Sequence, residues 1–292
     1  MKILITGANG QLGRDCQVVL GASHIVCGVD LPDIDIAEPN SVRVWFERFE
    51  PDCVVNCAAY TSVDDAESHV AICERVNARG PEVLADACRS AGAKLVQIST
   101  DYVFDGAKPV PEAYVETDPA NPQSVYGRTK LAGEAPVLAL PEGAILRTAW
   151  LYGESGRNFP RTMLRLAMCP PATPFRVIAD QYGSPTWSGR LARQIARLLE
   201  DFSPGLYHAT AHGHCTWHDF ACRFLRAAGM ERMPEPIPAS EYPTPARRPA
   251  NSILDNAALR ARGLDVMLPW EEDVDAFAAM VAPTWKEEMR NA

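Results

Sequence analysis

The sequence predicts an α/β fold in which a Rossmann-type, doubly wound parallel sheet is joined to a smaller, loop-rich C-terminal lobe. Short apolar runs rich in β-branched residues alternate with longer helical segments through the first half, which is typical of βαβ units. Past Trp150 this alternation fades and proline becomes frequent, most of all between Pro234 and Pro249. Dense proline indicates loops and short elements, so the second half should form the irregular lobe.

The expected strands are Lys2–Thr6, Ile25–Val29, Cys53–Ala58, Lys94–Ser99 and Ala144–Thr148. Helical spacing or a composition that favours helix marks Gln11–Leu20, Ser41–Phe49, His69–Ala91 and Ser124–Ala139. Asn121 and Pro122 are suited to begin the last of these helices. Phe175–Asp180 has strand character and is predicted to return to the main sheet.

A chain of 292 residues exceeds the length that one hydrophobic core usually serves. We therefore expect a dinucleotide-binding domain over residues 1–150, to which 175–202 returns. The segments 151–174 and 203–292 should form most of a substrate-binding lobe.

Composition restricts the partners and the compartment. The formal charge is −9 and no run of Lys or Arg is present, so neither nucleic acid nor an anionic membrane is an expected partner. Nine cysteines without a CxxC pair are typical of reduced thiols in a cytoplasmic protein. No stretch approaches the length of a membrane span, and Gly7 interrupts the first apolar run too early for a signal peptide.

A glycine-rich turn follows the first expected strand. Gly7, Gly10 and Gly13 are spaced G-x-x-G-x-x-G, with Gln11 and Leu12 between the last two, and a helix follows. A strand, a tight turn and a helix N-terminus bring backbone N–H groups and the positive end of the helix dipole to a pyrophosphate. The position of these glycines predicts dinucleotide binding.

Two residues give opposite indications about which dinucleotide is bound. Asp30 ends the second expected strand, where a carboxylate can accept hydrogen bonds from the adenosine ribose, which favours NADH. Arg14 follows the last glycine and could pair with a 2′-phosphate, which favours NADPH. These two residues therefore do not decide between NADH and NADPH.

Tyr126 and Lys130 are four residues apart in an expected helix, so both side chains lie on one face. Tyrosine is a poor proton donor until a nearby ammonium stabilises its phenolate, and Lys130 can supply that charge. Thr100 follows the fourth expected strand, at the sheet edge where ligands bind in open α/β folds. Together these residues indicate proton transfer coupled to hydride transfer.

With these motifs the chain resembles the extended short-chain dehydrogenase/reductase family, most of all its members that reduce nucleotide-linked keto-sugars. The resemblance covers nearly the whole chain. Beyond the glycine turn it is carried by the segments Asn56–Glu67, Val76–Ala78, Ser99–Gly106, Arg147–Gly153, Asn158-Phe159, Asp180–Thr186 and Ala246–Ser252.

The resemblance implies reduction of the 4-keto group of dTDP-4-dehydro-β-L-rhamnose to dTDP-β-L-rhamnose, with NADPH as the expected cofactor and NADH possible. It implies that Tyr126 protonates the reduced oxygen, that Thr100 orients the carbonyl, and that Lys130 activates Tyr126 and binds ribose. Further residues are expected to line the two halves of the site. For the cofactor they are Asp35, Ile36, Ala58, Ala59 and Tyr60, and for the substrate Asp101, Tyr102, Trp150, Asn158 and Arg248.

Two metal sites are considered and not expected. Some members of the family dimerise through Mg²⁺ held by glutamates, but Asp15 and the segment 187–190 supply no glutamate here, so Mg²⁺ is doubtful. Residues 207–218 hold four histidines and Cys215, but their spacing fits no standard zinc site. Thr216 and Asp219 instead predict a capping box for a helix over Phe220–Ala228.

Three alternatives share the cofactor turn. A 4-epimerase or a 4,6-dehydratase would keep NAD⁺ bound and recycle it; dehydratases typically carry Thr-Asp-Glu where this chain has Thr100, Asp101 and Tyr102. A non-catalytic regulatory subunit, similar to the one that accompanies methionine adenosyltransferase, would bind NADP without turnover. The intact Tyr126 and Lys130 count against it. A monomer or a homodimer acting on a small nucleotide-sugar is expected.

Overall fold

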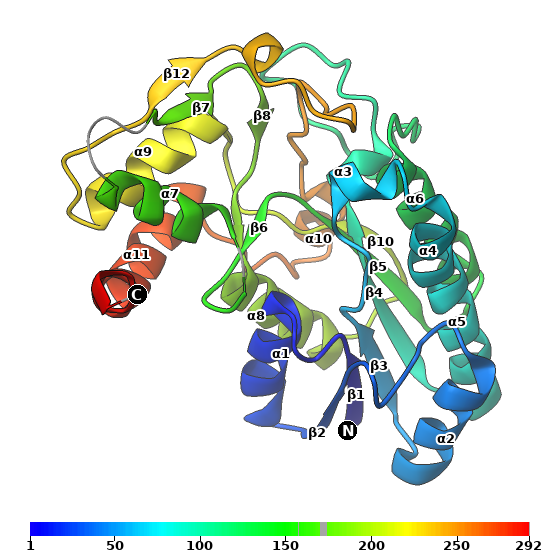
Figure 1. Ribbon diagram of the computed structural model, residues 1–292. Coiled ribbons are helices and arrows are strands. Elements are labelled where there is room, and N and C mark those ends of the chain that lie inside the picture. Colours follow the sequence, from blue (N-terminus) through cyan, green and yellow to red (C-terminus); the bar gives the residue numbers. More distant parts are fainter. Residues whose placement is uncertain (157, 170–173, 292) are drawn as a thin grey trace.

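A six-stranded parallel sheet forms the centre of the larger part of the molecule (Figure 1). The structure is a computed structural model that describes residues 1–156, 158–169 and 174–291. The strands lie in the order β10-β5-β4-β3-β1-β2, and every neighbouring pair is parallel. Their bounds are β1 Lys2–Thr6, β2 Ile25–Val29, β3 Cys53–Asn56, β4 Lys94–Thr100, β5 Gly143–Thr148 and β10 Gly205–His208.

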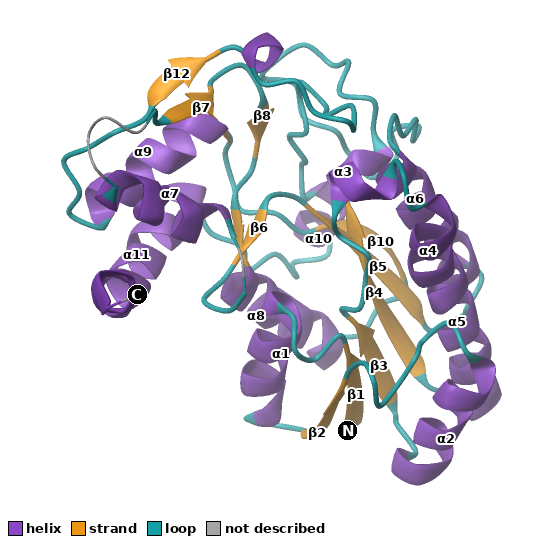
Figure 2. Cartoon of the chain, viewed as in Figure 1, coloured by secondary structure: helices purple, strands orange, loops and turns teal. Residues whose placement is uncertain are grey.

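Helices cover both faces of this sheet (Figure 2). Ile3 and Ile5 of β1 face a core shared with α1 and α8, whereas Leu4 between them faces the core on the α2 and α5 side. This alternation follows from the two-residue period of a strand. The bounds are α1 Gln11–Gly21, α2 Pro39–Phe49, α4 Val70–Glu74, α5 Gly80–Ala91, α6 Val125–Leu138 and α8 Ser188–Glu200. The predicted doubly wound α/β fold is confirmed.

The strand order reverses between β1 and β3, which pair directly, with Thr6 opposite Asn56. In open parallel sheets, ligands bind outside the carboxyl ends of the strands at such a reversal. Gly7 follows β1 and Cys57 follows β3, so the topology directs a ligand to this point.

The five strands predicted in the first half are all present, with ends shifted by at most two residues. The predicted helix over His69–Ala91 is not one continuous α-helix. A π-helical turn at Arg75–Arg79 separates α4 from α5. Asn121 does not cap α6. Ser124 does so, with its Oγ accepting from Gly127 N at 3.1 Å.

The smaller part is built around a second apolar core. Phe220 and Phe224 of α9 pack with Phe277 and Trp285 of α11 and with Tyr152. The predicted capping box is confirmed, since Thr216 and Asp219 exchange side-chain to backbone hydrogen bonds at the start of α9. The remaining elements are α3 Val63–Ala66, β6 Leu151–Tyr152, α7 Phe159–Met168, β7 Arg176–Ile178, β8 Tyr182–Gly183, β9 Thr186–Trp187, β11 Cys215–Thr216, α9 Trp217–Ala227, β12 Glu235–Ile237, α10 Ala257–Ala261 and α11 Trp270–Asn291.

The prediction that Phe175–Asp180 returns to the main sheet was wrong. Its strand, β7, pairs with β12 in a separate two-stranded sheet, and β10 takes the sixth place in the main sheet. A three-residue strand carries too short an apolar pattern to reveal its partner. Of the segment 151–174, residues 157 and 170–173 lie outside the described residues.

None of the helices that the structure describes is long and apolar enough to cross a bilayer.

Candidate active site

A cavity of about 870 Å³ opens at the carboxyl ends of the central strands, between the sheet and the smaller part. Seventeen of the nineteen residues predicted for the site line it: Gly7, Gly10, Gln11, Leu12, Gly13, Asp30, Asp35, Ile36, Ala58, Ala59, Tyr60, Thr100, Asp101, Tyr102, Tyr126, Lys130 and Trp150. Asn158 and Arg248 are not among its lining residues. The structure therefore gathers nearly all the predicted side chains around one space.

The glycine turn closes tightly over the ends of β1 and β3. Gly7 has a φ of +66°, and a Cβ on it would lie 2.6 Å from Ala58 N. A Cβ on Gly13 would lie 2.1 Å from Gly7 O. Only glycine fits at these two positions, and the turn leads directly into the N-terminus of α1. This is the backbone cradle that a pyrophosphate requires.

Asp30 holds the turn at the end of β2. Its Oδ2 accepts from Asn9 N at 2.9 Å and its Oδ1 accepts from Leu31 N at 2.8 Å. Arg14 donates from Nε to Asn9 O at 3.0 Å, so the two predicted determinants of cofactor choice flank the same residue. Asp30 and Asn9 line the cavity, whereas Arg14 is not among its lining residues.

Asp35 is fixed by an arginine that the sequence reasoning did not consider. Arg75 donates from Nη2 to Asp35 Oδ2 at 2.6 Å and to Glu38 Oε1 at 2.8 Å, and it also lines the cavity. This ion-pair triad ties the loop after β2 to the π-helical turn.

The loop after β3 is held by Asn77, which lies in the π-helical turn and is 1% exposed. Asn77 Oδ1 accepts from Tyr60 N at 2.9 Å, and Nδ2 donates to Tyr60 O at 3.0 Å. The same amide lies 3.3 Å from Thr129 Oγ1 on α6. Asn77 thereby fixes Ala59 and Tyr60 at the cavity wall.

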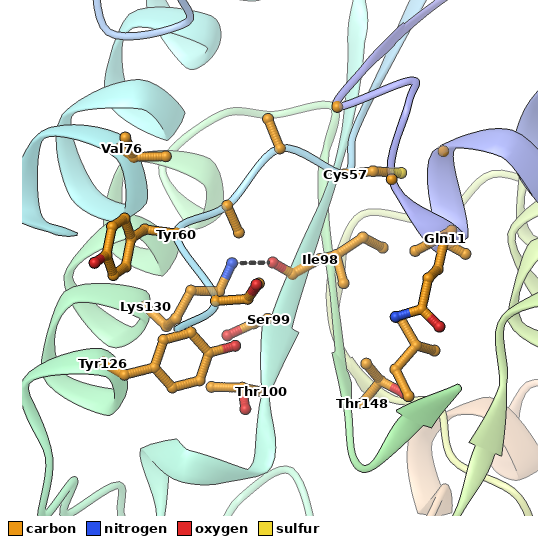
Figure 3. Close-up of a pocket in the computed structure, with 18 of the residues that line it drawn as sticks. Gln11, Cys57, Tyr60, Val76, Ile98, Ser99, Thr100, Tyr126, Lys130 and Thr148 are labelled. Atoms are coloured by element: carbon orange, nitrogen blue, oxygen red, sulfur yellow. Dashed lines mark hydrogen bonds between the residues drawn. The ribbon is translucent and has the colours of Figure 1, made fainter. Parts of the chain in front are cut away.

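Tyr126 and Lys130 both extend from α6 toward the end of β4, and Tyr126 lies beside Thr100 (Figure 3). Lys130 Nζ donates to Ile98 O at 2.6 Å. Burial lowers the pKa of Lys130 to about 8, and the charge of Glu134 opposes this shift. Burial raises the pKa of Tyr126, and its hydrogen bond with Thr100 opposes that rise. The predicted catalytic residues thus meet at one end of the cavity.

Asp101 is a buried carboxyl group next to this trio. It is 2% exposed, and Thr100 Oγ1 donates to its Oδ1 at 2.9 Å. Burial raises the pKa of Asp101 to about 6, against the hydrogen bonds that lower it. The neighbouring Tyr102 ring meets the Tyr126 ring edge to face at 5.6 Å.

Two tryptophans, Trp150 and Trp217, line the cavity. Trp150 follows β5 with a φ of +48°, a strained value for a residue with a side chain. Its ring stacks on Trp217 with centroids 3.6 Å apart. Gly183 leaves room for it, because a Cβ there would lie 2.4 Å from the ring. Trp217 lines the same cavity and comes from the other part of the molecule.

Several buried polar atoms of the cavity wall lack a partner among the described residues. They are Gln11 Oε1, Asp101 Oδ2 and Thr148 Oγ1. Buried polar groups are normally hydrogen-bonded, so these atoms fit a cavity that receives a polar molecule. With the glycine cradle, they fit a dinucleotide and a sugar.

The two predicted substrate residues outside the wall have local partners. Asn158 caps α7, with Oδ1 accepting from Arg161 N at 3.0 Å and Nδ2 donating to Gly153 O at 2.5 Å. Arg248 donates from Nη2 to Asp64 Oδ2 at 2.6 Å, while its Nη1 is buried and has no hydrogen-bond partner among the described residues. Their roles stay predictions.

Among the residues that the structure describes, no group of three His, Cys, Asp or Glu side chains could hold one metal ion. His212 pairs with Asp265, and His218 Nε2 donates to Pro234 O at 3.1 Å. Asp15 Oδ2 accepts from Ser188 Oγ at 2.5 Å. All nine cysteines are described and are free thiols.

Sequence reasoning missed Arg75 and Trp217, which line the cavity, and Asn77, Glu134 and Arg147, which act from behind it. Asn77 and Arg75 bind partners that lie 17 to 52 residues away in the sequence, so no local spacing links them. Glu134 alone carried a local signal, because it continues the interval of four from Tyr126 and Lys130.

The family model described as the RmlD substrate binding domain matches residues 1–282. A dTDP-4-dehydrorhamnose reductase of Burkholderia thailandensis is 41% identical over 90% of this chain and 93% of its own. A dTDP-4-keto-6-deoxy-D-glucose reductase of Streptomyces niveus is 40% identical over 91% of this chain and 93% of its own.

Solved structures agree with this assignment. The crystal structure of a dTDP-4-dehydrorhamnose reductase from Clostridium acetobutylicum superposes with a TM-score of 0.91 at 43% identity, covering 96% of this chain and 99% of that one. The enzyme of the same name from Bacillus anthracis, in complex with NADP, superposes with a TM-score of 0.90 at 38% identity, covering 94% and 98%.

Proposed function

This chain belongs to the RmlD substrate binding domain family, and on that premise we propose that it reduces the 4-keto group of dTDP-4-dehydro-β-L-rhamnose to dTDP-β-L-rhamnose. The protein is an oxidoreductase that takes hydride from NADPH, with NADH as a possible substitute. The observation that carries the proposal is the convergence of Thr100, Tyr126 and Lys130 at one end of a cavity whose other end is a dinucleotide cradle.

When bound, the reduced nicotinamide supplies the hydride for C4 of the sugar. Tyr126 holds the proton that the reduced oxygen receives, from the phenol oxygen that lies beside Thr100. Thr100 orients the carbonyl through its hydroxyl. Lys130, fixed by Ile98 O, provides the positive charge that stabilises the Tyr126 phenolate and the donors for a ribose hydroxyl.

The sugar end would be formed by Asp101, Tyr102 and Trp150, to which we add Trp217 because it stacks on Trp150. Arg248 and Asn158 would serve the nucleotide end. Arg248 has a buried guanidinium nitrogen without a partner, which supports its assignment to an anionic or carbonyl-bearing group.

We place the dinucleotide in the sheet domain of residues 1–150 with α8 and β10, and the substrate in the smaller lobe. The nine free cysteines favour a cytoplasmic location. A monomer or a homodimer without a bridging metal fits the residues around Asp15.

The test is an assay with purified protein, dTDP-4-dehydrorhamnose and NADPH or NADH, followed at the absorbance of the reduced nicotinamide. Stoichiometric oxidation of the cofactor supports reduction. Tyr126→Phe should keep the affinity for NADPH and lose most turnover, about 10²- to 10⁴-fold for a general acid.

Two other results would identify a different function. Conversion of the sugar without net loss of reduced cofactor would point to an epimerase. Tight NADPH binding with no oxidation in any condition would overturn the enzymatic proposal and leave a regulatory subunit.

A further inference from the structure

Glu134 is the third residue in a line on α6, because Tyr126, Lys130 and Glu134 follow one another at intervals of four. Residues four apart on a helix lie one above the other on the same face. Tyr126 and Lys130 line the cavity, whereas Glu134 lies behind it and is 2% exposed. A carboxylate so deeply buried requires a partner.

Its partners come from β5 and β4, which are neighbours in the sheet. Arg147 of β5 donates from Nε to Glu134 Oε1 at 2.9 Å and from Nη2 to Oε2 at 2.6 Å. Ser99 of β4 donates from Oγ to Oε1 at 2.5 Å. Ser99 lies between Ile98, whose carbonyl binds Lys130, and Thr100. Glu134 therefore attaches the strand that carries Thr100 to the helix that carries Tyr126 and Lys130.

This ion pair is poorly arranged for stability alone. The Arg147 side chain is 4% exposed, and its Nη1 has no partner among the described residues. Desolvation of two charges offsets most of their attraction unless all their hydrogen bonds are satisfied, and well-packed apolar residues often stabilise a core as well or better. Retaining the pair suggests a role in the neighbouring site.

The negative charge of Glu134 acts on Lys130. Burial depresses the pKa of Lys130, and Glu134 is the largest opposing charge. Cys57, which follows β3, and Cys73 of α4 face Lys130 with smaller effects in the same direction. On the far side of Arg147, His208 of β10 is neutral at ordinary pH because burial and Arg147 lower its pKa to about 3. Glu134 is thus the principal group that favours the charged form of Lys130.

We propose that Glu134 is a positioning residue that keeps Lys130 protonated at neutral pH and fixes β4 against α6, so that Lys130 can act on Tyr126. Glu134 touches neither substrate nor cofactor and acts through Lys130 and Ser99. The proposal rests on the reductase function proposed above.

The charge of Lys130 can be measured without turnover. The chain has five lysines, so protein labelled with [¹³Cε]lysine gives few resonances, and a Lys130→Arg sample identifies the one required. Titration should give a lower midpoint for Lys130 in Glu134→Gln than in the wild type. Glu134→Asp, which keeps the charge, should restore much of the difference. A midpoint that coincides with the wild type in Glu134→Gln overturns the proposal.

Asp273→Asn is the matched control, because Asp273 is 1% exposed and pairs with Arg190 at 2.9 Å in another part of the molecule. It breaks a buried ion pair as Glu134→Gln does, but it should leave the Lys130 midpoint unchanged.

If Glu134→Gln does not fold, the double variant Glu134→Gln/Arg147→Gln removes both charges. It should still lower the Lys130 midpoint, because Glu134 is the charge that faces Lys130. An unchanged midpoint in the double variant also overturns the proposal.

The pH profile of kcat provides the second measurement. Lys130 acts in its charged form, so activity should fall as the pH rises through its pKa, and this fall should begin at lower pH in Glu134→Gln. At pH 8 the loss should be about fivefold, because a midpoint lowered by about one unit from about 8 reduces the charged fraction of Lys130 from about one half to about one tenth. An inactive wild type would refute the proposed function, whereas an active wild type whose profile matches that of Glu134→Gln would refute the role of Glu134 alone.

Discussion

The side-chain amide of Asn77 binds Tyr60 through both of its backbone polar groups, at 2.9 Å to the N–H and 3.0 Å to the carbonyl oxygen. The two residues are 17 positions apart, and Asn77 lies in a π-helical turn, a distortion that often occurs at functional sites. The amide therefore fixes the loop that forms the cofactor wall after β3.

We predict that Asn77→Ala raises the Kd for NADPH about tenfold, because two buried hydrogen bonds that order the loop are lost, each worth about 1 kcal/mol. Fluorescence titration with NADPH measures this. Asn256→Ala is a matched control: Asn256 binds both backbone groups of Thr210, at 3.1 and 2.8 Å, outside the cavity wall. It should lower Tm comparably and leave the Kd unchanged. Equal effects of the two variants on Kd would refute a specific role for Asn77.

Arg14 should select between the two cofactors. Both oxygens of Asp30 already accept backbone N–H groups, whereas Arg14 is exposed and donates to Asn9 O through Nε, so that we expect its Nη groups to meet a 2′-phosphate. We expect Arg14→Ala to raise KM for NADPH about tenfold and KM for NADH less than about twofold, as loss of one charge-assisted contact predicts. Initial rates with each cofactor measure this, and Arg43→Ala on exposed α2 serves as the control. Equal losses with both cofactors would show that Arg14 does not contact the phosphate.

Asp101 should lower the stability of the ligand-free protein at neutral pH. Its pKa is higher in the folded state than in the unfolded state, so its stabilising contribution is present below pH 3.8 and is lost as the pH rises through about 6. A rise from 3.8 to about 6 corresponds to about 3 kcal/mol at pH 7. Asp101→Asn keeps an acceptor for Thr100 and carries no charge.

We therefore expect Asp101→Asn to raise the free energy of unfolding at pH 7 by up to about 3 kcal/mol, with a gain that shrinks between pH 6 and pH 4. Urea unfolding at several pH values measures this. Asp105→Asn should not stabilise, because hydrogen bonds from Ala107, Tyr114 and Asn121 lower the pKa of Asp105. A gain that does not depend on pH would contradict the assigned cause.

The tryptophan pair should determine binding of the sugar nucleotide. Trp217→Ala removes the ring that stacks on Trp150 at 3.6 Å and should raise KM for the sugar nucleotide about three- to tenfold, with little change in the Kd for NADPH. Trp217→Phe keeps an aromatic ring and should lose less. If Trp217→Ala weakened NADPH binding as much as sugar binding, the pair would belong to the cofactor side.

Local patterns were sufficient to predict five of the six strands of the sheet and most of the cavity wall. The strands of the first half are continuous apolar runs, and Gly7 to Gly13 and Tyr126 with Lys130 are short spacings that a sequence displays directly. The three-residue β7 offered no such pattern, and its pairing with β12 joins segments about 60 residues apart. Long-range contacts decided that part of the fold.

The same distinction holds within the site. Tyr126 and Lys130 could be assigned roles because tyrosine and lysine have recognisable chemistry at a helical spacing. Asn77 and Arg147 act through partners from distant elements, and the position of the Trp150 ring depends on the absence of a side chain at Gly183. Such positioning groups become visible only when the chain is folded.

The destination of the hydride tests the central claim most directly. The protein should be incubated with dTDP-4-dehydrorhamnose and NADPH that carries two deuterium atoms on C4 of the nicotinamide, and the product analysed by NMR and mass spectrometry. Reduction as proposed predicts one deuterium at C4 of the sugar and one oxidised cofactor released for each product. A product without deuterium at C4, or a sugar converted while the cofactor keeps both deuterium atoms, would contradict the assignment.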